Sequence, residues 1–200
     1  MLFQSQSSLF DTSLTAGPEG LRYEPDFLAP REERELIDLI DTLPLHEMQY
    51  KDYTAKRRIV SFGGQYDFAR QALRPADGPP PELAALQRRA AAWLGVAPDA
   101  FTQILVAEYS PGTPLGWHRD VADFEDIVGV SLLSNAVLRF RPYPPSAPKK
   151  ADIVKLLVEP RSIYVLRGPA RWAWQHSIAP TAQLRYSITL RTKRSLPGAI

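Results

Sequence analysis

The sequence predicts an α+β fold in which two helices precede a β core. Apolar residues recur at three- and four-residue spacing in two segments before residue 95, which indicates helices. From Phe101 onward, short β-rich runs alternate with Pro, Gly, Ser and Asn. Many short strands with turn signals are typical of a sandwich, a barrel or a jelly roll. The length of 200 residues suits a single domain spanning 1–200 with a core of its own.

The first helix is expected to begin at Pro30, since proline suits the first turn and the acidic residues that follow suit the positive end of the helix dipole. Its apolar stripe ends at Leu43. A second helix is expected after Pro81, with an apolar stripe that ends at Leu94. Gly95 is expected to end it.

The segment between the two helices, residues 50–68, is aromatic and basic, and we expect a small extended lobe or hairpin there. Beyond the second helix we expect six β-strands, over residues 103–109, 127–133, 136–141, 153–158, 162–166 and 184–191.

Composition excludes several classes of function. The chain has no Cys, which excludes disulfide scaffolds, Cys-ligated zinc, iron–sulfur clusters and thiol nucleophiles. The formal net charge of +2 argues against wholesale wrapping of nucleic acid, although it permits a local basic patch. No apolar run approaches the roughly 20 residues that span a bilayer, and the N-terminus does not resemble a secretory signal. We therefore expect a soluble cytoplasmic protein, and a monomer since no heptad or exposed apolar stripe is evident.

The three histidines suggest a metal site. In an extended segment His118 and Asp120 point to the same side and can reach one ion. His176 lies 58 positions later, just before the last predicted strand. Two histidines and one carboxylate form the facial triad of non-haem Fe(II) oxygenases, although a surface hydrogen bond between His118 and Asp120 is the ordinary alternative. His46 has no such partner and is interpreted as a loop histidine.

The last predicted strand has two distinct faces. Its even positions are apolar and should pack into a core, whereas its odd positions carry Arg185, Ser187, Thr189 and Arg191 and should line a cavity or face solvent. Six residues separate the two arginine Cα atoms by roughly 20 Å. A dicarboxylate lying between them would suit this spacing, because guanidinium grips carboxylate bidentately. On an exposed edge the same arginines would simply be solvated.

Several short motifs occur in one order along residues 62–191: Tyr109-Ser-Pro-Gly112, His118-Arg-Asp120, Gly129-Val-Ser-Leu132, Leu138-Arg-Phe140, the run from Pro160 to Gly168, Arg171-Trp172, Trp174-Gln-His176 and Arg185-x5-Arg191. Together they resemble the AlkB-like dioxygenases, which depend on 2-oxoglutarate and Fe(II). The resemblance implies a double-stranded β-helix (jelly-roll) core over about 100–192, N-terminal supporting helices and a substrate-recognition lid over about 45–80.

The resemblance also implies site residues. Fe(II) would be held by His118, Asp120 and His176, which are thus the expected catalytic residues. The positions that match those holding 2-oxoglutarate are Tyr109, Arg185 and Ser187 for the distal carboxylate, and Arg191 near the metal-chelating end.

One residue departs from the family pattern. Ala107 stands where the family commonly has an Asn that helps to hold the chelating carboxylate. We therefore expect cosubstrate binding that is weaker or differently shaped, in a site whose triad and arginines are intact.

The activity implied by the resemblance is oxidative demethylation of alkylated bases in DNA or RNA repair. It would consume O2 and 2-oxoglutarate and release formaldehyde, succinate and CO2. Residues 56–68 resemble the nucleotide-recognition lid, in which Arg57 and Arg58 would meet phosphates. Tyr66, Phe68 or Trp172 would stack an extruded base. Further cations extend this basic patch: Arg139, Arg141, Lys149, Lys150 and Lys155.

Other functions remain open. Aromatic residues can simply pack a hairpin while basic residues face water. The modest net charge favours an oxygenase that acts on protein side chains or on a small molecule. Ala107 favours a non-catalytic nucleic-acid-binding member of the fold. A steep salt dependence of substrate binding would indicate phosphate contacts, and a flat one would favour the non-nucleic-acid substrates.

Overall fold

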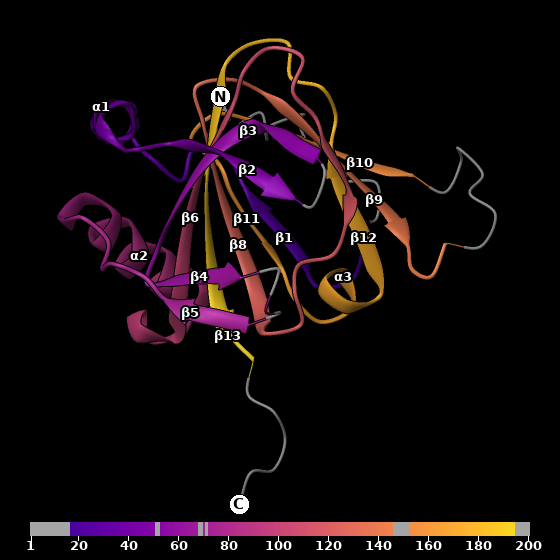
Figure 1. The fold of residues 1–200 in the computed structure, drawn as a ribbon. Coiled ribbons are helices and arrows are strands. Elements are labelled where there is room, and N and C mark those ends of the chain that lie inside the picture. Colours follow the sequence, from indigo (N-terminus) through magenta and orange to yellow (C-terminus); the bar gives the residue numbers. More distant parts are fainter. Residues whose placement is uncertain (1–16, 51–52, 68–69, 71, 146–152, 195–200) are drawn as a thin grey trace, which may run out of the picture.

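Two antiparallel β-sheets face each other in the computed structural model, which describes residues 17–50, 53–67, 70, 72–145 and 153–194 (Figure 1). The seven-stranded large sheet has, from edge to edge, the strands β1 (Leu21–Glu24), β11 (Ile163–Leu166), β8 (Phe124–Leu132), β13 (Arg185–Lys193), β6 (Phe101–Tyr109), β3 (Tyr53–Phe62) and β2 (His46–Tyr50). The four-stranded small sheet has the strands β10 (Val154–Val158), β9 (Ala136–Pro142), β12 (Trp174–Ile178) and β7 (Leu115–His118). A separate hairpin joins β4 (Gly64–Asp67) to β5 (Ala72–Pro75).

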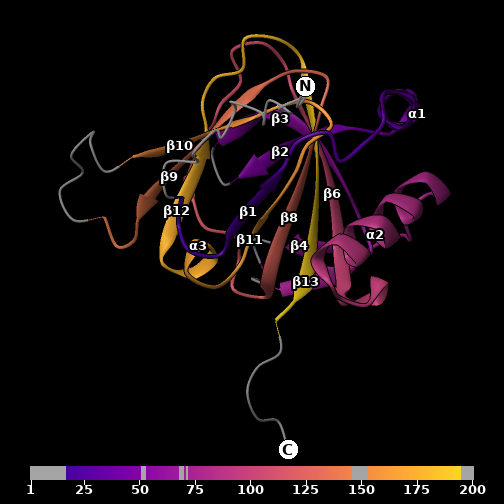
Figure 2. The same ribbon diagram turned by 180° about the vertical axis from the view of Figure 1, so that it is seen from behind.

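Helices cover the side of the large sheet that faces away from the small sheet (Figures 1 and 2). These are α1 (Pro30–Thr42) and α2 (Pro81–Leu94), followed by a 3-10 turn (Pro98–Ala100); a short helix, α3 (Gly168–Trp172), precedes β12. The Glu32 carboxylate accepts a hydrogen bond from the Ala29 N–H at 2.7 Å, which caps the start of α1. Gly95, with a φ of +79°, ends α2 as the sequence predicts.

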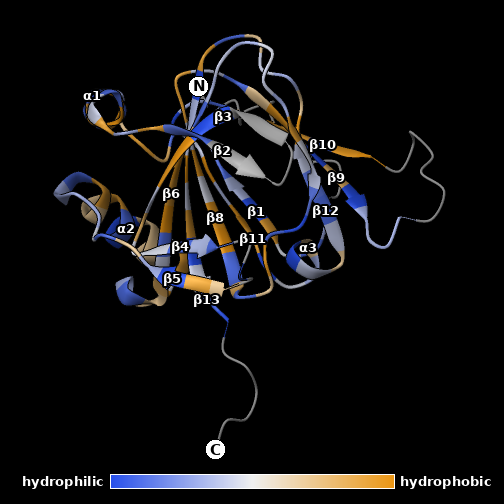
Figure 3. Ribbon diagram, viewed as in Figure 1, coloured by the Kyte–Doolittle hydropathy of each residue, from blue (hydrophilic) through white to orange (hydrophobic). Residues whose placement is uncertain are grey.

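Two cores follow from this arrangement. The first lies between the helices and the large sheet, where Tyr186, Ile188 and Leu190 of β13 pack with buried residues of α1 and α2. Figure 3 shows the strand β6 in mostly hydrophobic colours beside these helices. The second core fills part of the space between the sheets, with Phe124 of β8 and Leu138 of β9 among its members. The prediction that the even positions of β13 pack into a core is therefore confirmed, and the odd positions face the small sheet.

The six strands predicted after residue 101 agree with the structure to within three residues at either end, but β7 and β12, which carry His118 and His176, were not predicted. The extended hairpin expected over residues 50–68 is confirmed in part, since β3 pairs with β2. It is not a separate lobe, because β3 also pairs with β6, with Ile59 opposite Ala107, and so extends the large sheet. Sequence patterns do not reveal this long-range pairing. Without β3, the strand β6 would be at the edge of the sheet, with unpaired backbone N–H and C=O groups. His46 is not in a loop but begins β2, where it lines the cavity described below.

The predicted lid region contains β2, β3 and the β4–β5 hairpin. Within the residues that the structure describes, no helix is both long enough and apolar enough to cross a membrane.

Candidate metal centre and cosubstrate pocket

A cavity of about 1610 Å³ lies between the two sheets. Much of its large-sheet wall is formed by odd-numbered residues on three neighbouring strands: Arg57, Ile59 and Ser61 on β3; Gln103, Leu105, Ala107 and Tyr109 on β6; and Arg185, Ser187, Thr189 and Arg191 on β13. Alternation along each strand, together with the register that sets Arg185 opposite Tyr109, brings these side chains to one face. The prediction that the odd face of the last strand lines a cavity is confirmed.

His118, Asp120 and His176 meet at one point of this cavity. His118 ends β7 and lies opposite His176 on β12, with ring centroids 4.2 Å apart. Asp120 follows two residues after β7, and its Oδ2 lies 3.5 Å from His176 Nε2. One ligand atom from each residue lies within 4.8 Å of the others, so small side-chain rotations bring all three donors onto one ion.

Hydrogen bonding prepares the His118 ring for a metal. Its Nδ1 lies 2.8 Å from the Gly116 carbonyl oxygen. Because a carbonyl oxygen only accepts, the proton sits on Nδ1 and the lone pair of Nε2 is available to an ion.

Electrostatics sets the charge of the three donors. Burial lowers the pKa of His118 and lowers that of His176 to about 3, so both rings are neutral at pH 7. Burial opposes ionisation of Asp120, but the positive charge of Arg191 holds the pKa of Asp120 well below its usual range. The donor set is therefore two neutral imidazoles and one carboxylate, which fits Fe(II) and leaves coordination positions for other ligands.

Arg191 orients the Asp120 carboxylate. Its Nε and Nη2 lie 2.8 and 2.7 Å from Asp120 Oδ1, while its Nη1 donates to Gln103 Oε1 at 2.8 Å. Asp120 Oδ2 is buried and, among the described residues, has no hydrogen-bond partner. The free oxygen is thus on the side of His176, where a metal ion would satisfy it.

Arg171 is a supporting residue that the sequence analysis named within a motif but to which it gave no role. It is 2% exposed, and its Nη2 donates to the carbonyl oxygens of Asp120, Val121 and Phe124 at 3.1, 2.7 and 3.1 Å. These contacts fix the turn that carries Asp120. The available signal was an arginine in the Arg171-Trp172 motif shortly before a triad histidine.

Arg185 is prepared to bind an anion. The side chain is 1% exposed, and its Nε donates to Ser131 Oγ at 3.1 Å. Both terminal nitrogens are buried and have no hydrogen-bond partner among the described residues. Its guanidinium carbon lies 5.2 Å from the centre of the Tyr109 ring, and Ser187 lines the same wall. A buried guanidinium in this state fits the distal carboxylate of a dicarboxylic acid.

The residues expected to contact the substrate divide into two groups. Arg57 and Tyr66 line the cavity. Arg58 points to the opposite face of β3, where it pairs with the Glu108 carboxylate at 2.9 and 2.5 Å. Strand alternation separates these neighbouring arginines, so they cannot act together as expected. Phe68 lies outside the described residues.

Trp172 is not brought to the cavity wall either. Its Nε1 donates to Glu125 Oε1 at 2.9 Å, and its ring lies between the guanidinium groups of Arg171 and Arg194, at 4.2 and 4.4 Å. The indole is therefore held on the outside of the short helix α3, away from the position that stacking on an extruded base requires.

Comparison with known proteins identifies the family. Residues 20–194 match the family model of the 2OG-Fe(II) oxygenase superfamily. The chain belongs to this superfamily. This AlkB-like oxygenase is similar to the alkylated DNA repair protein ALKBH8 homolog of Arabidopsis thaliana, with 29% identity over 95% of the chain and 62% of the relative. It is 25% identical to the tRNA (carboxymethyluridine(34)-5-O)-methyltransferase alkbh8 of Xenopus tropicalis, over 82% of the chain and 26% of the relative.

The AlkB-like oxygenase thus spans less than two thirds of the length of these two relatives. Its fold matches the solved structure of OsALKBH1 with a TM-score of 0.71 and 14% identity, covering 88% of this chain and 98% of that one. The predicted double-stranded β-helix fold and the predicted family are confirmed. Fe(II), 2-oxoglutarate and O2 are the cofactor and cosubstrates of the superfamily, and the donor set described above fits the iron.

Proposed function

We propose that this AlkB-like oxygenase oxidatively demethylates alkylated bases of nucleic acid. Fe(II), with 2-oxoglutarate and O2, supplies the oxidising power that hydroxylates an N-methyl carbon; the product then loses formaldehyde, and 2-oxoglutarate leaves as succinate and CO2. The observation that carries the substrate class is a cationic and aromatic surface beside the cavity.

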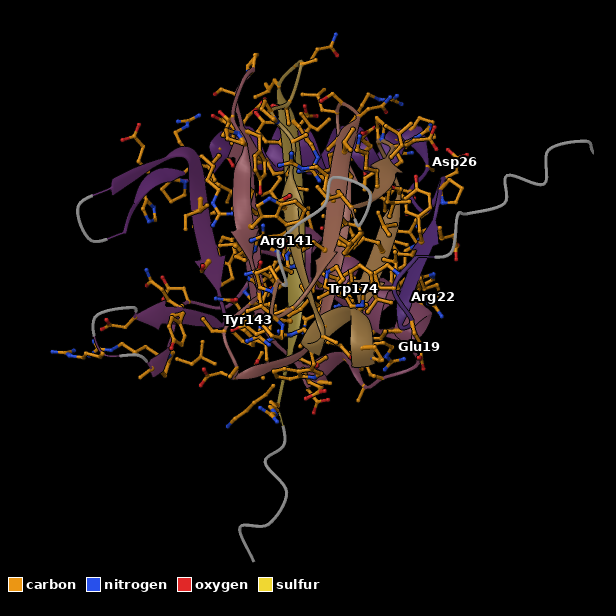
Figure 4. The ribbon with its side chains drawn as sticks, turned by 90° about the vertical axis from the view of Figure 1, so that its right-hand side faces the viewer. Glu19, Arg22, Asp26, Arg141, Tyr143 and Trp174 are labelled. Carbon is orange, nitrogen blue, oxygen red and sulfur yellow. The ribbon has the colours of Figure 1, made fainter. Side chains whose placement is uncertain are left out.

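This surface is the outer face of the small sheet, whose four strands contain no Asp or Glu. Figure 4 views the molecule from this side, with Arg141 and Tyr143 labelled. We call it the arginine face and define it by six residues: Trp117, Arg119, Arg139, Arg141, Tyr143 and Lys155.

Stacking holds the cations of the arginine face in place. The guanidinium groups of Arg139 and Arg141 lie 5.3 and 4.6 Å from the Trp117 ring centre, and that of Arg119 lies 3.7 Å from the Tyr143 ring centre. Such pre-ordered guanidinium groups lose little freedom when they bind an anion.

Among the described residues, no carboxylate neutralises the two central arginines of the arginine face. Arg139 donates through Nε to Ser177 Oγ at 3.0 Å, and Arg141 donates through Nε to Gln175 Oε1 at 2.8 Å. Both acceptors are neutral. Across the described ranges, no carboxylate forms an ion pair with these arginines. Phosphodiesters are the natural complement of such a surface.

The arginine face leads to the cavity, because Trp117 and Arg119 also line its wall. A strand whose phosphates lie on the face can therefore turn one base into the cavity toward the triad. Tyr66 lines the same cavity and offers a ring for base stacking. The relatives named above for alkylated DNA repair and for tRNA modification support a nucleic-acid substrate as a class.

Within the cavity the chain's own groups would position the reaction. Asp120, held by Arg191, and the two histidines would hold the iron, while Arg185 with Tyr109 would hold 2-oxoglutarate. Enclosure between the sheets limits the access of bulk water to the oxidant.

The test measures formaldehyde and succinate from Fe(II)-loaded protein with a single-stranded oligonucleotide that carries 1-methyladenine. We expect both products in equal amounts, none from the unmodified oligonucleotide and none from His118→Ala. Succinate that does not depend on the oligonucleotide would redirect the substrate to proteins or small molecules. Binding without any succinate would indicate the non-catalytic alternative.

The arginine face is tested by the Arg139→Gln/Arg141→Gln double variant. We expect about a tenfold rise in KM for the oligonucleotide, and a fall of about 1.4 in the slope of log affinity against log salt, since each single-strand phosphate contact contributes about 0.7. The matched control is Arg31→Gln/Arg34→Gln, which removes two exposed charges from α1 on the far side of the large sheet. Equal effects of the two double variants would refute a phosphate-binding role.

A further inference from the structure

We infer that Arg57 is a third arginine of the cosubstrate pocket, which binds the distal carboxylate of 2-oxoglutarate together with Arg185 and Tyr109. The inference concerns the cosubstrate and does not depend on which substrate is oxidised.

Three neighbouring strands bring these residues into one row. On β3 and β6, Arg58 lies opposite Glu108, which places the preceding Arg57 beside Tyr109. On β6 and β13, Tyr109 lies opposite Arg185. All three members of the row, Arg57, Tyr109 and Arg185, line the cavity. A tyrosine hydroxyl between two arginines on one sheet face is a suitable seat for a carboxylate.

The contacts within the row leave several hydrogen-bond donors of the two arginines without an acceptor among the described residues. Arg57 Nη1 lies 3.5 Å from the Tyr109 hydroxyl oxygen, which is a long hydrogen bond at most. Arg57 Nε is buried without a hydrogen-bond partner, and so are both terminal nitrogens of Arg185. Neither arginine has a carboxylate within ion-pair distance in the parts of the chain that the structure describes. The buried guanidinium of Arg185 and the half-buried one of Arg57 lie on either side of one ring and repel each other, and an anion between them removes that cost.

Arg58 helps to fix the position of Arg57, its neighbour on β3. Its bidentate pair with Glu108 ties β3 to β6 directly beside the row, on the opposite face of the sheet. The two consecutive arginines therefore have different tasks, one anchoring the strand and the other facing the cavity.

The alanine at position 107 removes one cosubstrate contact of the family pattern, and Arg57 can compensate for that loss. Ala107 is 1% exposed, lines the cavity one alternation away from Tyr109, and offers no polar atom where the family pattern has an amide. The guanidinium of Arg57 would raise the affinity for 2-oxoglutarate of a pocket that lacks this amide contact. Sequence reasoning placed Arg57 against phosphate, but its buried Nε beside Tyr109 lies on the cosubstrate wall.

The test compares Arg57→Gln with the wild type by calorimetry, using Mn(II)-loaded protein, which binds without turnover. The ligands are 2-oxoglutarate and 2-oxopentanoate, which has the same chain without the distal carboxylate. We expect the Kd of 2-oxoglutarate to rise about 10- to 100-fold, the effect of losing a hydrogen bond between charged groups. The Kd of 2-oxopentanoate should be unchanged, and Arg57→Lys should restore part of the loss.

Arg31→Gln on α1 is the control for a general loss of positive charge, and thermal melting of the metal-free variants checks the fold. An unchanged Kd for 2-oxoglutarate would overturn the inference. An equal loss for both ligands would also overturn it, because the effect would then lie at the metal end or in the fold. Intact 2-oxoglutarate binding with weakened oligonucleotide binding would assign Arg57 to the nucleic acid instead.

Discussion

Replacing Arg171 with methionine should loosen the turn that carries Asp120 and weaken metal binding. The Arg171 guanidinium is the donor to three carbonyl oxygens of this turn, at Asp120, Val121 and Phe124. Methionine keeps much of the side-chain volume but removes the donor, so the three oxygens lose their partner in a buried place.

The size of the effect follows from these contacts. All three come from one nitrogen with two hydrogens, so they amount to about two full hydrogen bonds from a charged donor, each contributing about 1.5–3 kcal/mol. Part of this loss in stability is offset, because the substitution also removes a buried charge and a buried Nε that has no hydrogen-bond partner among the described residues. A net loss of about 2–3 kcal/mol in the free energy of unfolding is expected. Metal affinity should fall by about 10- to 100-fold, as when the support of a metal ligand is removed.

Urea unfolding of the metal-free protein and Mn(II) calorimetry measure the two quantities. Arg119→Gln is the matched control, since this nearby arginine is exposed and donates to one carbonyl oxygen, that of Trp172. It should change stability by less than about 1 kcal/mol. If Arg171→Met left both stability and metal affinity at wild-type values, the idea that Arg171 fixes the Asp120 turn would be refuted.

Three further predictions concern the same cavity. Gly129→Ala should lower stability by about 1–3 kcal/mol in thermal or urea unfolding, because its Cβ would lie 2.2 Å from Cζ of the Tyr164 ring; wild-type stability would contradict this packing. Metal-free protein should lose about 2 kcal/mol between pH 7 and pH 5 from His176 alone, because its folded pKa of about 3 lies below the unfolded value of about 6.5 and the unfolded state takes up the proton first. Urea unfolding against pH checks this, and His176→Gln should flatten the dependence. Asp120→Asn should abolish tight Mn(II) binding and lower stability by about 3 kcal/mol, since it leaves the charge of Arg191 buried without its carboxylate; unchanged calorimetry would count against the triad.

Local patterns were sufficient for much of the fold and for two of the three triad residues. The faces of β13 follow from period-two alternation, and the end of α2 follows from the left-handed conformation of Gly95. His118 and Asp120 come together as their spacing predicts, although Asp120 lies in a turn two residues beyond the end of β7. The approach of His176 depends on the register of β12 against β7, which only the family resemblance anticipated.

Features that depend on long-range packing were not predicted. Arg57 and Arg58 look equivalent in the sequence, and only the pairing of β3 with β6 decides which one faces the cavity. Trp172 has the composition of a stacking residue, but its contacts with Glu125 and two arginines hold it outside. The Arg171-Trp172 motif marks this arginine in the sequence, but its role depends on backbone carbonyl groups, which are present at every position and do not identify its partners.

Anaerobic titration of the metal-free protein with Fe(II) and then 2-oxoglutarate tests the central claim most directly. If His118, Asp120 and His176 form an iron site beside a cosubstrate pocket, the wild type will bind one Fe(II) per chain. Addition of 2-oxoglutarate will then produce the visible charge-transfer absorption of a 2-oxo acid that chelates Fe(II). His118→Ala should lose both signals while keeping its fold by circular dichroism. A wild-type protein that binds no Fe(II), or that binds it and gives no absorption with 2-oxoglutarate, would contradict the account.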